Sequence, residues 1–303
     1  MKPTKKIWYN GKIINWDHAQ THVLTNALHY GAGVFEGIRY YHTENGPAIF
    51  SLKEHLDRLF YSASFINLDK KIKCNENDLS DAIEELIEKN LVKEGYLRII
   101  LFWGMNSLSY QPELLCPANA AIALWAWDPT REKDTVKMKT TKYKKLHPDS
   151  TIIDAKLCGN YINAILANAE VINDGYDEPL FLDYENNVAE GAEKNLFMVK
   201  NGIIYTPPKG FIMPGLTREV LIPLAKDLGY KIEEKKFTLQ ELKKADEVFL
   251  TSTVVRILPV SQIDDKKLVP KKGPVTMHLK DEFENIVRGK NEKYSKYLTY
   301  LNI

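Results

Sequence analysis

The sequence has few cysteines, almost no net charge and no long apolar run, and each shortage excludes a class of protein. Its three cysteines, Cys74, Cys116 and Cys158, lack metal-type spacing and cannot form a disulfide framework, so we expect a reducing compartment and no bound metal. The net charge of +1 gives no overall attraction to nucleic acid or to an anionic membrane. No apolar stretch has the length of a membrane span, and the first residues lack a signal core. We therefore expect a cytoplasmic protein with no nucleic-acid and no membrane partner.

The chain has enough apolar residues to form a large core. Its 303 residues, 44% of them hydrophobic, fit one large domain or two smaller ones. The stretch 128–137 is charged, contains Pro129 and has little periodicity, which is typical of a linker. We predict an N-terminal domain at 1–127, a linker at 128–137 and a C-terminal domain at 138–303. The lysines at 142, 144 and 145, and those at 266–272, are more typical of solvated loops than of binding patches.

Three Asn-Gly pairs, at 10–11, 45–46 and 201–202, separate β-type segments and predict hairpins in both halves of the chain. Ser51 followed by Glu54 predicts a capping box that opens a helix. Apolar periodicity and β-propensity predict further elements. The predicted helices cover 52–63, 79–87, 161–173 and 217–228, and the predicted strands cover 97–102, 120–127, 179–184, 196–199 and 248–252.

Three residues could together bind an aldehyde cofactor. Lys156 lies among small and apolar residues, Tyr161 follows five positions later, and Glu190 precedes a predicted strand. A lysine amine, a phenol and a carboxylate are the groups that hold the aldehyde, the ring oxygen and the pyridine nitrogen of pyridoxal phosphate. Taken alone, Lys156 is more typical of a solvated lysine and Tyr161 of a core tyrosine, whereas the local pattern of Glu190 fits an exposed turn carboxylate equally well. A functional Lys156 would be partly buried, because desolvation lowers the pKa of an amine and favours its neutral, nucleophilic form.

A phosphate site is expected further along the chain. Pro214 and Gly215 open a predicted helix whose first N–H groups are available to an anion, with the Thr217 hydroxyl as an extra donor. Thr253, after a predicted strand, offers another hydroxyl, although such hydroxyls usually belong to turns. Arg58 lies off the apolar stripe of its helix; most such arginines are only solvated, but a guanidinium is well suited to clamp a phosphate.

These residues belong to a longer ordered pattern, which resembles the class IV aminotransferases, also known as fold-type IV pyridoxal phosphate enzymes. The pattern comprises Glu190, Ala192, Asn195-Leu196-Phe197, Ile204, Thr206, Met213, Gly215-Leu216 and Arg218, and similarity extends from 8–11 through 29–31 and 34–39 to 258–260. The resemblance implies an α+β fold with a small N-terminal α/β sandwich domain and a larger C-terminal pseudo-barrel domain. It also implies pyridoxal 5'-phosphate as cofactor.

The same resemblance implies a role for each matching residue. Lys156 would be the Schiff-base lysine and proton shuttle, Glu190 the partner of the pyridine nitrogen, and Tyr161 the partner of the ring oxygen. The phosphate would be held by Arg58, Leu216, Thr217 and Thr253. The substrate would be lined by Tyr30, Phe35, Gly37, Arg39, Tyr96, Arg98, Trp127 and Val254, with Arg98 as the partner of a second substrate carboxylate.

The implied reaction is transamination between the branched-chain L-amino acids leucine, isoleucine and valine and 2-oxoglutarate, which gives branched 2-oxo acids and L-glutamate. A homodimer or higher homo-oligomer with shared active sites is expected. One alternative is another fold-type IV enzyme, such as a D-amino-acid aminotransferase or an aminodeoxychorismate lyase, against which Tyr30, Gly37, Arg39, Tyr96 and Arg98 together argue. Another is a non-catalytic oligomeric binding protein on the same fold, which the combination of lysine, tyrosine and glutamate disfavours.

Three segments depart from the family pattern. Residues 104–110 replace a loop that is glycine-rich in many relatives, so the contacts of that loop do not transfer. Val254-Val255 stand where smaller residues are common, which predicts crowding of the substrate. Lys194 stands where a glutamate is frequent, which leaves the surroundings of Arg58 open.

Overall fold

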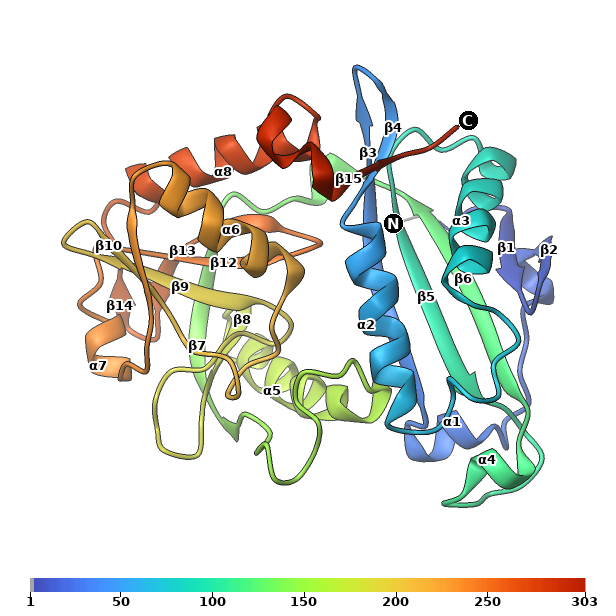
Figure 1. The fold of residues 1–303 in the computed structure, drawn as a ribbon. Coiled ribbons are helices and arrows are strands. Elements are labelled where there is room, and N and C mark those ends of the chain that lie inside the picture. Colours follow the sequence, from blue (N-terminus) through green and yellow to red (C-terminus); the bar gives the residue numbers. More distant parts are fainter. Residues whose placement is uncertain (1–2, 303) are drawn as a thin grey trace. The chain divides into compact units, whose positions relative to one another are not determined.

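The computed structural model describes residues 3–302, and these form two compact units. The first unit comprises the chain up to Pro129 together with Ala155–Gly159 and the segment from Ile286 onward, and the second comprises Thr130–Asp154 and Asn160–Asn285. Each unit has its own sheet and helices, so the expected α+β class is confirmed (Figure 1). Two segments that the linear division assigned to the C-terminal domain, 155–159 and 286–302, thus belong to the first unit by compactness.

The first unit is built on a seven-stranded sheet in the order β15-β4-β3-β5-β6-β1-β2. Its strands are β1 (Lys6–Tyr9), β2 (Lys12–Asn15), β3 (Gly33–Thr43), β4 (Gly46–Phe50), β5 (Gly95–Trp103), β6 (Ala118–Ala126) and β15 (Leu298–Tyr300). All of its neighbouring strands pair antiparallel. The predicted hairpins at 10–11 and 45–46 are confirmed, and Asn10 and Gly11 adopt positive φ values of 47° and 87° that suit a tight turn.

Two long helices, α2 (Leu52–Ser64) and α3 (Glu76–Asn90), cover one face of this sheet (Figure 1). Their apolar stripes pack against the alternate strand residues of β3, β5 and β6 in one continuous core. The predicted capping box at Ser51 is wrong, because Ser51 has φ 54° and its side chain makes no cap hydrogen bond. The capping box lies instead at the start of α3, where Asn75 and Asp78 cap each other's backbone N–H. The first unit also contains two short helices, α1 (Asn26–Tyr30) and α4 (Pro112–Leu115).

The second unit contains an eight-stranded sheet in which β11-β10-β9-β12-β13-β7-β8 form one path and β14 pairs with β13. The strands are β7 (Val136–Lys144), β8 (Glu178–Leu182), β9 (Asn195–Lys200), β10 (Ile203–Thr206), β11 (Lys231–Glu234), β12 (Glu247–Ser252), β13 (Arg256–Ile263) and β14 (Lys266–Lys267). The helices are α5 (Ile162–Asn173), α6 (Leu216–Asp227), α7 (Leu239–Leu242) and α8 (Pro274–Val287). The hairpin predicted at 201–202 joins β9 to β10 and is confirmed. No helix among residues 3–302 is long and apolar enough to cross a membrane.

The helix α5 exposes several large apolar side chains. On α5, Ile162, Ile165 and Ile172 are exposed, whereas Ala167 and Val171 are the buried residues of this helix. A large apolar side chain costs free energy when it stays in water, so three of them exposed on one helix mark an apolar surface.

Candidate active site

Five predicted substrate residues lie on one face of the β3–β5 pair. Alternation along β3 directs Val34, Glu36 and Ile38 toward the helices and places Phe35, Gly37 and Arg39 on the opposite face. On β5 the same rule places Tyr96 and Arg98 on that opposite face, and the register pairs Gly37 with Arg98 and Arg39 with Tyr96. The structure therefore brings together Phe35, Gly37, Arg39, Tyr96 and Arg98.

Two arginines are held over aromatic rings on this face. The Arg98 guanidinium carbon lies 4.4 Å from the centroid of the Phe35 ring, and Arg98 Nη2 donates to the Tyr96 hydroxyl over 2.8 Å. The guanidinium carbon of Arg39 lies 3.6 Å from the ring of Trp127. Both are cation–π contacts that fix a charge against an apolar wall. Trp127 therefore lies with the five residues on this face of the β3–β5 pair, because its ring stacks on Arg39.

Gly37 is required by close packing on this face. A Cβ at position 37 would lie 2.1 Å from the Tyr96 hydroxyl oxygen. Any side chain there would displace Tyr96 and, through their hydrogen bond, Arg98. The resemblance placed Gly37 among the substrate residues, and the structure adds that it makes room for the tyrosine that orients Arg98.

The backbone of Lys156 is clamped between β3 and α2. Its N–H donates to Ser62 Oγ over 2.9 Å, its C=O accepts from the N–H of Phe35 over 3.2 Å, and the next residue, Leu157, forms a β-bridge with Val34. This segment fills the edge of β3 that β4 does not reach, because β4 pairs only with residues 40–43. The side chain is half-buried, as expected of a functional lysine, and its Nζ lies 5.5 Å from the centroid of the Phe35 ring.

Arg58 is paired with a buried carboxylate that the sequence reading did not single out. Glu36 is fully buried, and its carboxylate accepts from Arg58 Nε over 2.6 Å, from Arg58 Nη2 over 3.0 Å and from His55 Nδ1 over 2.7 Å. Burial alone would raise the pKa of Glu36, but the charge of Arg58 and the hydrogen bond from His55 hold that pKa well below its usual range. Arg58 is thus oriented by an ionised glutamate of its own unit.

In the second unit, Glu190 is buried and held by three donors. Its carboxylate accepts from Lys145 Nζ over 2.6 Å, from Asn195 Nδ2 over 2.7 Å and from the N–H of Met213 over 3.0 Å. The alternative of an exposed turn carboxylate is wrong, because only 2% of Glu190 is exposed. The reading of Lys145 as a solvated loop lysine is also wrong, since its side chain is 16% exposed and paired with this buried carboxylate. The run of lysines around it hid its role.

Asn195 connects Glu190 to the turn before α6. Besides donating to Glu190, its amide donates to the C=O of Met213 over 2.8 Å and accepts from the N–H of Gly215 over 3.0 Å. A Cβ at Gly215 would lie 2.4 Å from Asn195 Oδ1, so this close approach needs glycine. The carboxylate and the helix start are therefore fixed to each other within the unit.

The start of α6 has the features of an anion site. Gly215 is its N-cap and makes no side-chain cap, so the first N–H groups of the helix, at Leu216 and Thr217, have no intrahelical acceptor. Thr217 is buried. Thr253 and Val254 lie in the turn between β12 and β13. Val255, expected to crowd a substrate, packs instead against the core of the second unit.

Lys194, Tyr161 and Tyr30 complete the predicted set. Lys194 pairs with Glu178 over 2.9 Å in the second unit, while Arg58 has its carboxylate partner in the first. Tyr161 is half-buried at the N-cap of α5. Tyr30 is 43% exposed at the end of α1, where its ring lies 5.0 Å from that of Tyr110. Each unit thus supplies a part of the predicted set.

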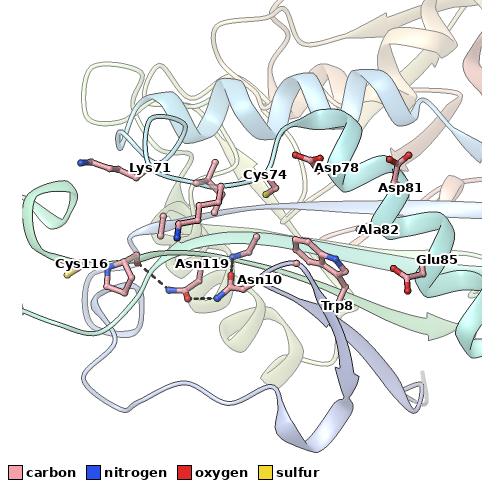
Figure 2. A pocket seen from close by; sticks show the side chains of 16 residues that line it. Trp8, Asn10, Lys71, Cys74, Asp78, Asp81, Ala82, Glu85, Cys116 and Asn119 are labelled. Atoms are coloured by element: carbon pink, nitrogen blue, oxygen red, sulfur yellow. Dashed lines mark hydrogen bonds between the residues drawn. The ribbon is translucent and has the colours of Figure 1, made fainter.

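A cavity of about 940 Å³ in the first unit involves none of these residues (Figure 2). It is lined by α3, by the ends of β1 and β6 and by residues 71–74. Among its polar groups, Asn10 Nδ2 donates to Asn119 Oδ1 over 2.8 Å, Asn10 Oδ1 accepts from the N–H of Ala120, and Asp78 caps α3. None of its lining residues belongs to the predicted site.

Comparison with known proteins shows the family to which this chain belongs. The family model of the class IV aminotransferases matches residues 33–263, and the chain belongs to that family. Among its relatives are the branched-chain-amino-acid aminotransferases of Pseudomonas aeruginosa, 37% identical with 97% of this chain and 96% of that protein covered, and of Escherichia coli K12, 33% identical with 99% of each covered. A crystal structure of the T.th. branched-chain amino acid aminotransferase complexed with N-(5'-phosphopyridoxyl)-L-glutamate is 37% identical, has a TM-score of 0.94 and matches 99% of each chain.

Proposed function

We propose that this protein transfers amino groups between branched-chain L-amino acids and 2-oxoglutarate with pyridoxal 5'-phosphate as cofactor. The single observation that carries the substrate assignment is the Arg98 guanidinium held over the Phe35 ring, because it places a cation within an apolar wall. The T.th. enzyme, which is similar to this chain over its whole length, has been crystallised with 4-methylvaleric acid and with N-(5'-phosphopyridoxyl)-L-glutamate. The first ligand has a branched apolar chain, and the second carries the side-chain carboxylate of glutamate.

The residues present fit the cofactor. A carboxylate has about four acceptor positions, and three described donors reach Glu190, so it can accept one more hydrogen bond, from a pyridinium N–H. The first N–H groups of α6, the Thr217 and Thr253 hydroxyls and the Arg58 guanidinium suit the phosphate. Tyr161 would donate to the ring oxygen. These assignments, like that of Lys156, rest on the family pattern together with the local geometry.

Bound pyridoxal phosphate supplies an electron sink for the bond broken at the substrate Cα. The chain supplies the remaining chemistry. The Nζ of Lys156 would hold the cofactor and, once released from it, would serve as the base that moves the substrate Cα proton. Glu190 would pair with the pyridine nitrogen, and Lys145 and Asn195 hold the Glu190 carboxylate in place.

Both substrates must use one pocket in turn. Phe35, Trp127 and Tyr30 would provide the apolar wall that a leucine side chain needs, and Arg98 would pair with the second carboxylate of glutamate. Arg98 is suited to this because Tyr96 and Phe35 already hold its guanidinium in place. Little side-chain entropy is then lost when an anion binds.

A panel of amino donors tests this proposal. Leucine, isoleucine, valine, D-alanine and phenylalanine are each supplied to the purified protein with 2-oxoglutarate, and glutamate formation is measured. We expect the three branched-chain donors to give the highest kcat/KM. Activity with D-alanine alone would instead indicate a D-amino-acid aminotransferase. A protein that is colourless and binds no pyridoxal phosphate would support the non-catalytic alternative.

We further propose a homodimer that joins through an apolar surface on the first unit. Segments 22–30 and 104–115 lie together, since Asn26 N–H donates to the C=O of Gly104 and Asn26 Nδ2 to that of Ser109. Their exposed apolar side chains are Val23, Leu24, Leu28, Tyr30, Met105, Leu108, Tyr110, Leu114 and Leu115. So many on two adjoining segments favour a protein partner. A second copy is the proposed partner, because the family resemblance implies a homo-oligomer with shared active sites.

Leu28→Glu should weaken this association. Leu28 is 68% exposed, so its replacement leaves the monomer's fold intact, whereas a glutamate buried in an apolar interface raises the dimer dissociation constant on the order of a hundredfold. Light scattering over a dilution series measures that constant. Leu91→Glu, at an 89% exposed leucine beyond α3, is the control and should leave it unchanged. An undiminished dimer in Leu28→Glu would place the interface elsewhere.

The cytoplasm remains the proposed location. Cys74, Cys116 and Cys158 are all free thiols, which suits a reducing compartment.

A further inference from the structure

Glu178 is a buried carboxylate that has no part in the proposed reaction so far. It is the first residue of β8, and its register partner on β7 is the buried Met138. A buried carboxylate is costly unless it is paired, so its contacts indicate what it stabilises. The segment 188–190 runs antiparallel to β8, with the Phe181 N–H donating to the C=O of Glu190 over 2.9 Å. The chain beyond Glu190 therefore returns toward the start of β8, where Glu178 lies.

The turn at 191–194 is closed by its own backbone and by the residues that flank it. The Gly191 N–H donates to the C=O of Lys194 over 2.8 Å, and Glu190 and Asn195 form an antiparallel bridge. The Asn195 amide also donates to the Glu190 carboxylate over 2.7 Å. The carboxylate proposed to pair with the pyridine nitrogen and the amide that holds it thus flank one short turn. The conformation of this turn sets how the two side chains meet.

Glu178 holds this turn at two points. Its Oε1 accepts from the Ala192 N–H over 2.8 Å, and its Oε2 accepts from Lys194 Nζ over 2.9 Å. Both are charge-assisted hydrogen bonds, and little of either side chain is exposed, 13% for Lys194 and 6% for Glu178. Burial alone would lower the pKa of Lys194, but the charges of Glu178 and Glu193 raise that pKa, so the amine stays protonated.

Gly191 makes room for the Glu178 carboxylate. A Cβ at position 191 would lie 2.6 Å from Glu178 Oε1. The φ of Gly191 lies outside the left-handed region, so its backbone would accept an alanine, and the need for glycine comes from the approach of Glu178. The turn and the carboxylate are therefore fitted to each other, as Asn195 and Gly215 are.

At the opposite end of β9, the turn at 201–202 is held in a similar way. Asp246 accepts from Lys200 Nζ over 2.8 Å and from the Asn201 N–H over 2.7 Å. This second pair is more exposed, with 39% of the Lys200 and 49% of the Asp246 side chain in contact with solvent. None of the predicted site residues lies in that turn. The two ion pairs thus differ in burial and in what their turns carry.

We propose that Glu178 and Lys194 are positioning residues, which hold the turn at 191–194 so that the Glu190 carboxylate meets the pyridine nitrogen of the cofactor. A carboxylate held at hydrogen-bond distance favours the protonated form of that nitrogen, and a carboxylate that moves favours it less. This inference rests on the proposed function for the role of Glu190. The contacts of the Glu178–Lys194 pair lie within the protein and exist without the cofactor.

Hydrogen exchange of the apoprotein, read by mass spectrometry of a peptide that spans the turn, tests these contacts. Glu178→Ala removes both of them at once. The Ala192 N–H loses its acceptor directly, so faster exchange of that one amide is expected in any case. We expect the Gly191 N–H to exchange faster as well, by about tenfold or more, which is the scale of a lost charge-assisted hydrogen bond.

The protonation of the bound cofactor gives a second measurement. Pyridoxal phosphate with an isotopically labelled ring nitrogen reports by NMR whether that nitrogen carries a proton. We expect a protonated nitrogen in the wild type and a shift toward the unprotonated signal in Glu178→Ala, with the cofactor Kd raised by roughly tenfold. Lys194→Met removes one of the two contacts and should have a smaller effect in the same direction. Lys194→Arg, which can still donate to Glu178, should restore much of the wild-type signal.

Asp246→Ala is the matched control, because it releases the turn at 201–202 on the same strand. It should speed exchange at that turn and leave the Gly191 amide and the nitrogen signal unchanged. A purely structural ion pair would lower the melting temperature in Glu178→Ala and leave the nitrogen signal unchanged, and that result overturns the proposal. If Glu178→Ala does not fold, Gly191→Ala gives the same test, since its added Cβ displaces the carboxylate and keeps both charges.

Failure of the proposed function would look different. If the wild-type apoprotein binds no pyridoxal phosphate on titration, the role of Glu190 falls, whatever the exchange of the turn shows. If the cofactor binds with a protonated ring nitrogen and Glu178→Ala leaves that nitrogen fully protonated, only the positioning role of Glu178 and Lys194 falls.

Discussion

Replacing Lys156 with alanine is expected to reduce transamination between leucine and 2-oxoglutarate by on the order of a thousandfold or more, because the change removes both the group that holds the cofactor and the base that moves the Cα proton. The fold should persist. The Lys156 backbone N–H and C=O make the contacts to Ser62 and Phe35, and alanine retains both of them. The steady-state rate of glutamate formation, together with the visible absorbance of the purified protein, measures the effect.

Lys53→Ala provides the control, since Lys53 is a well-exposed lysine on α2 that pairs only locally with Asp57. Its rate and absorbance should match those of the wild type. Addition of a small primary amine such as methylamine should restore part of the activity of Lys156→Ala, since an external base can take over the proton transfer. Near-normal turnover of Lys156→Ala without added amine would show that another group carries the chemistry.

The sequence predicted those parts of the fold that depend on residues close together along the chain. Asn-Gly pairs dictate hairpins because both residues accept positive φ, and Asn10 and Gly11 do so in the structure. The helix at 52–63 also follows from its apolar stripe. The capping box at Ser51 failed for a tertiary reason: Ser51 N–H donates to the C=O of Tyr297, far away in the sequence, and its φ of 54° prevents the usual cap geometry.

The candidate site was predictable where a strand sets the direction of its side chains. Once Phe35, Gly37 and Arg39 lie on β3, alternation alone puts them on one face. Glu36, which lies between these residues in the sequence, was not predicted. Its role depends on His55 and Arg58, which reach it from α2 and leave no signal in the sequence around Glu36. Spatial pairs between distant elements leave no local signal.

Lys145 illustrates the limit most clearly. In the sequence it stands in a run of lysines whose most frequent role is solvation. In the structure its amine is within 2.6 Å of Glu190, 45 positions later, because β7 and β8 run parallel and place the chain after β7 beside the segment that follows β8. Only the position of Glu190, a buried carboxylate in need of a cation, could have suggested such a partner.

Arg98→Leu is expected to separate the two halves of the reaction. The glutamate side chain carries a second carboxylate into a pocket walled by Phe35 and Trp127, and an unpaired carboxylate in such surroundings binds poorly. The specificity constant for glutamate should therefore fall on the order of a hundredfold, whereas that for leucine, whose side chain needs only the apolar wall, should change by about threefold or less. Single-turnover kinetics with each amino acid alone, followed by the cofactor absorbance, measure the halves separately.

Arg98→Lys sharpens this prediction. A lysine keeps the positive charge but loses the planar group that donates to Tyr96 and stacks on Phe35, so it should recover only part of the glutamate rate. Charge and orientation would then be shown to contribute separately. If Arg98→Leu damaged the leucine and glutamate halves equally, Arg98 would have to act on the α-carboxylate that every substrate shares or on the packing of the β3–β5 face. A normal glutamate rate in Arg98→Leu would mean that the second carboxylate is bound by a different cation.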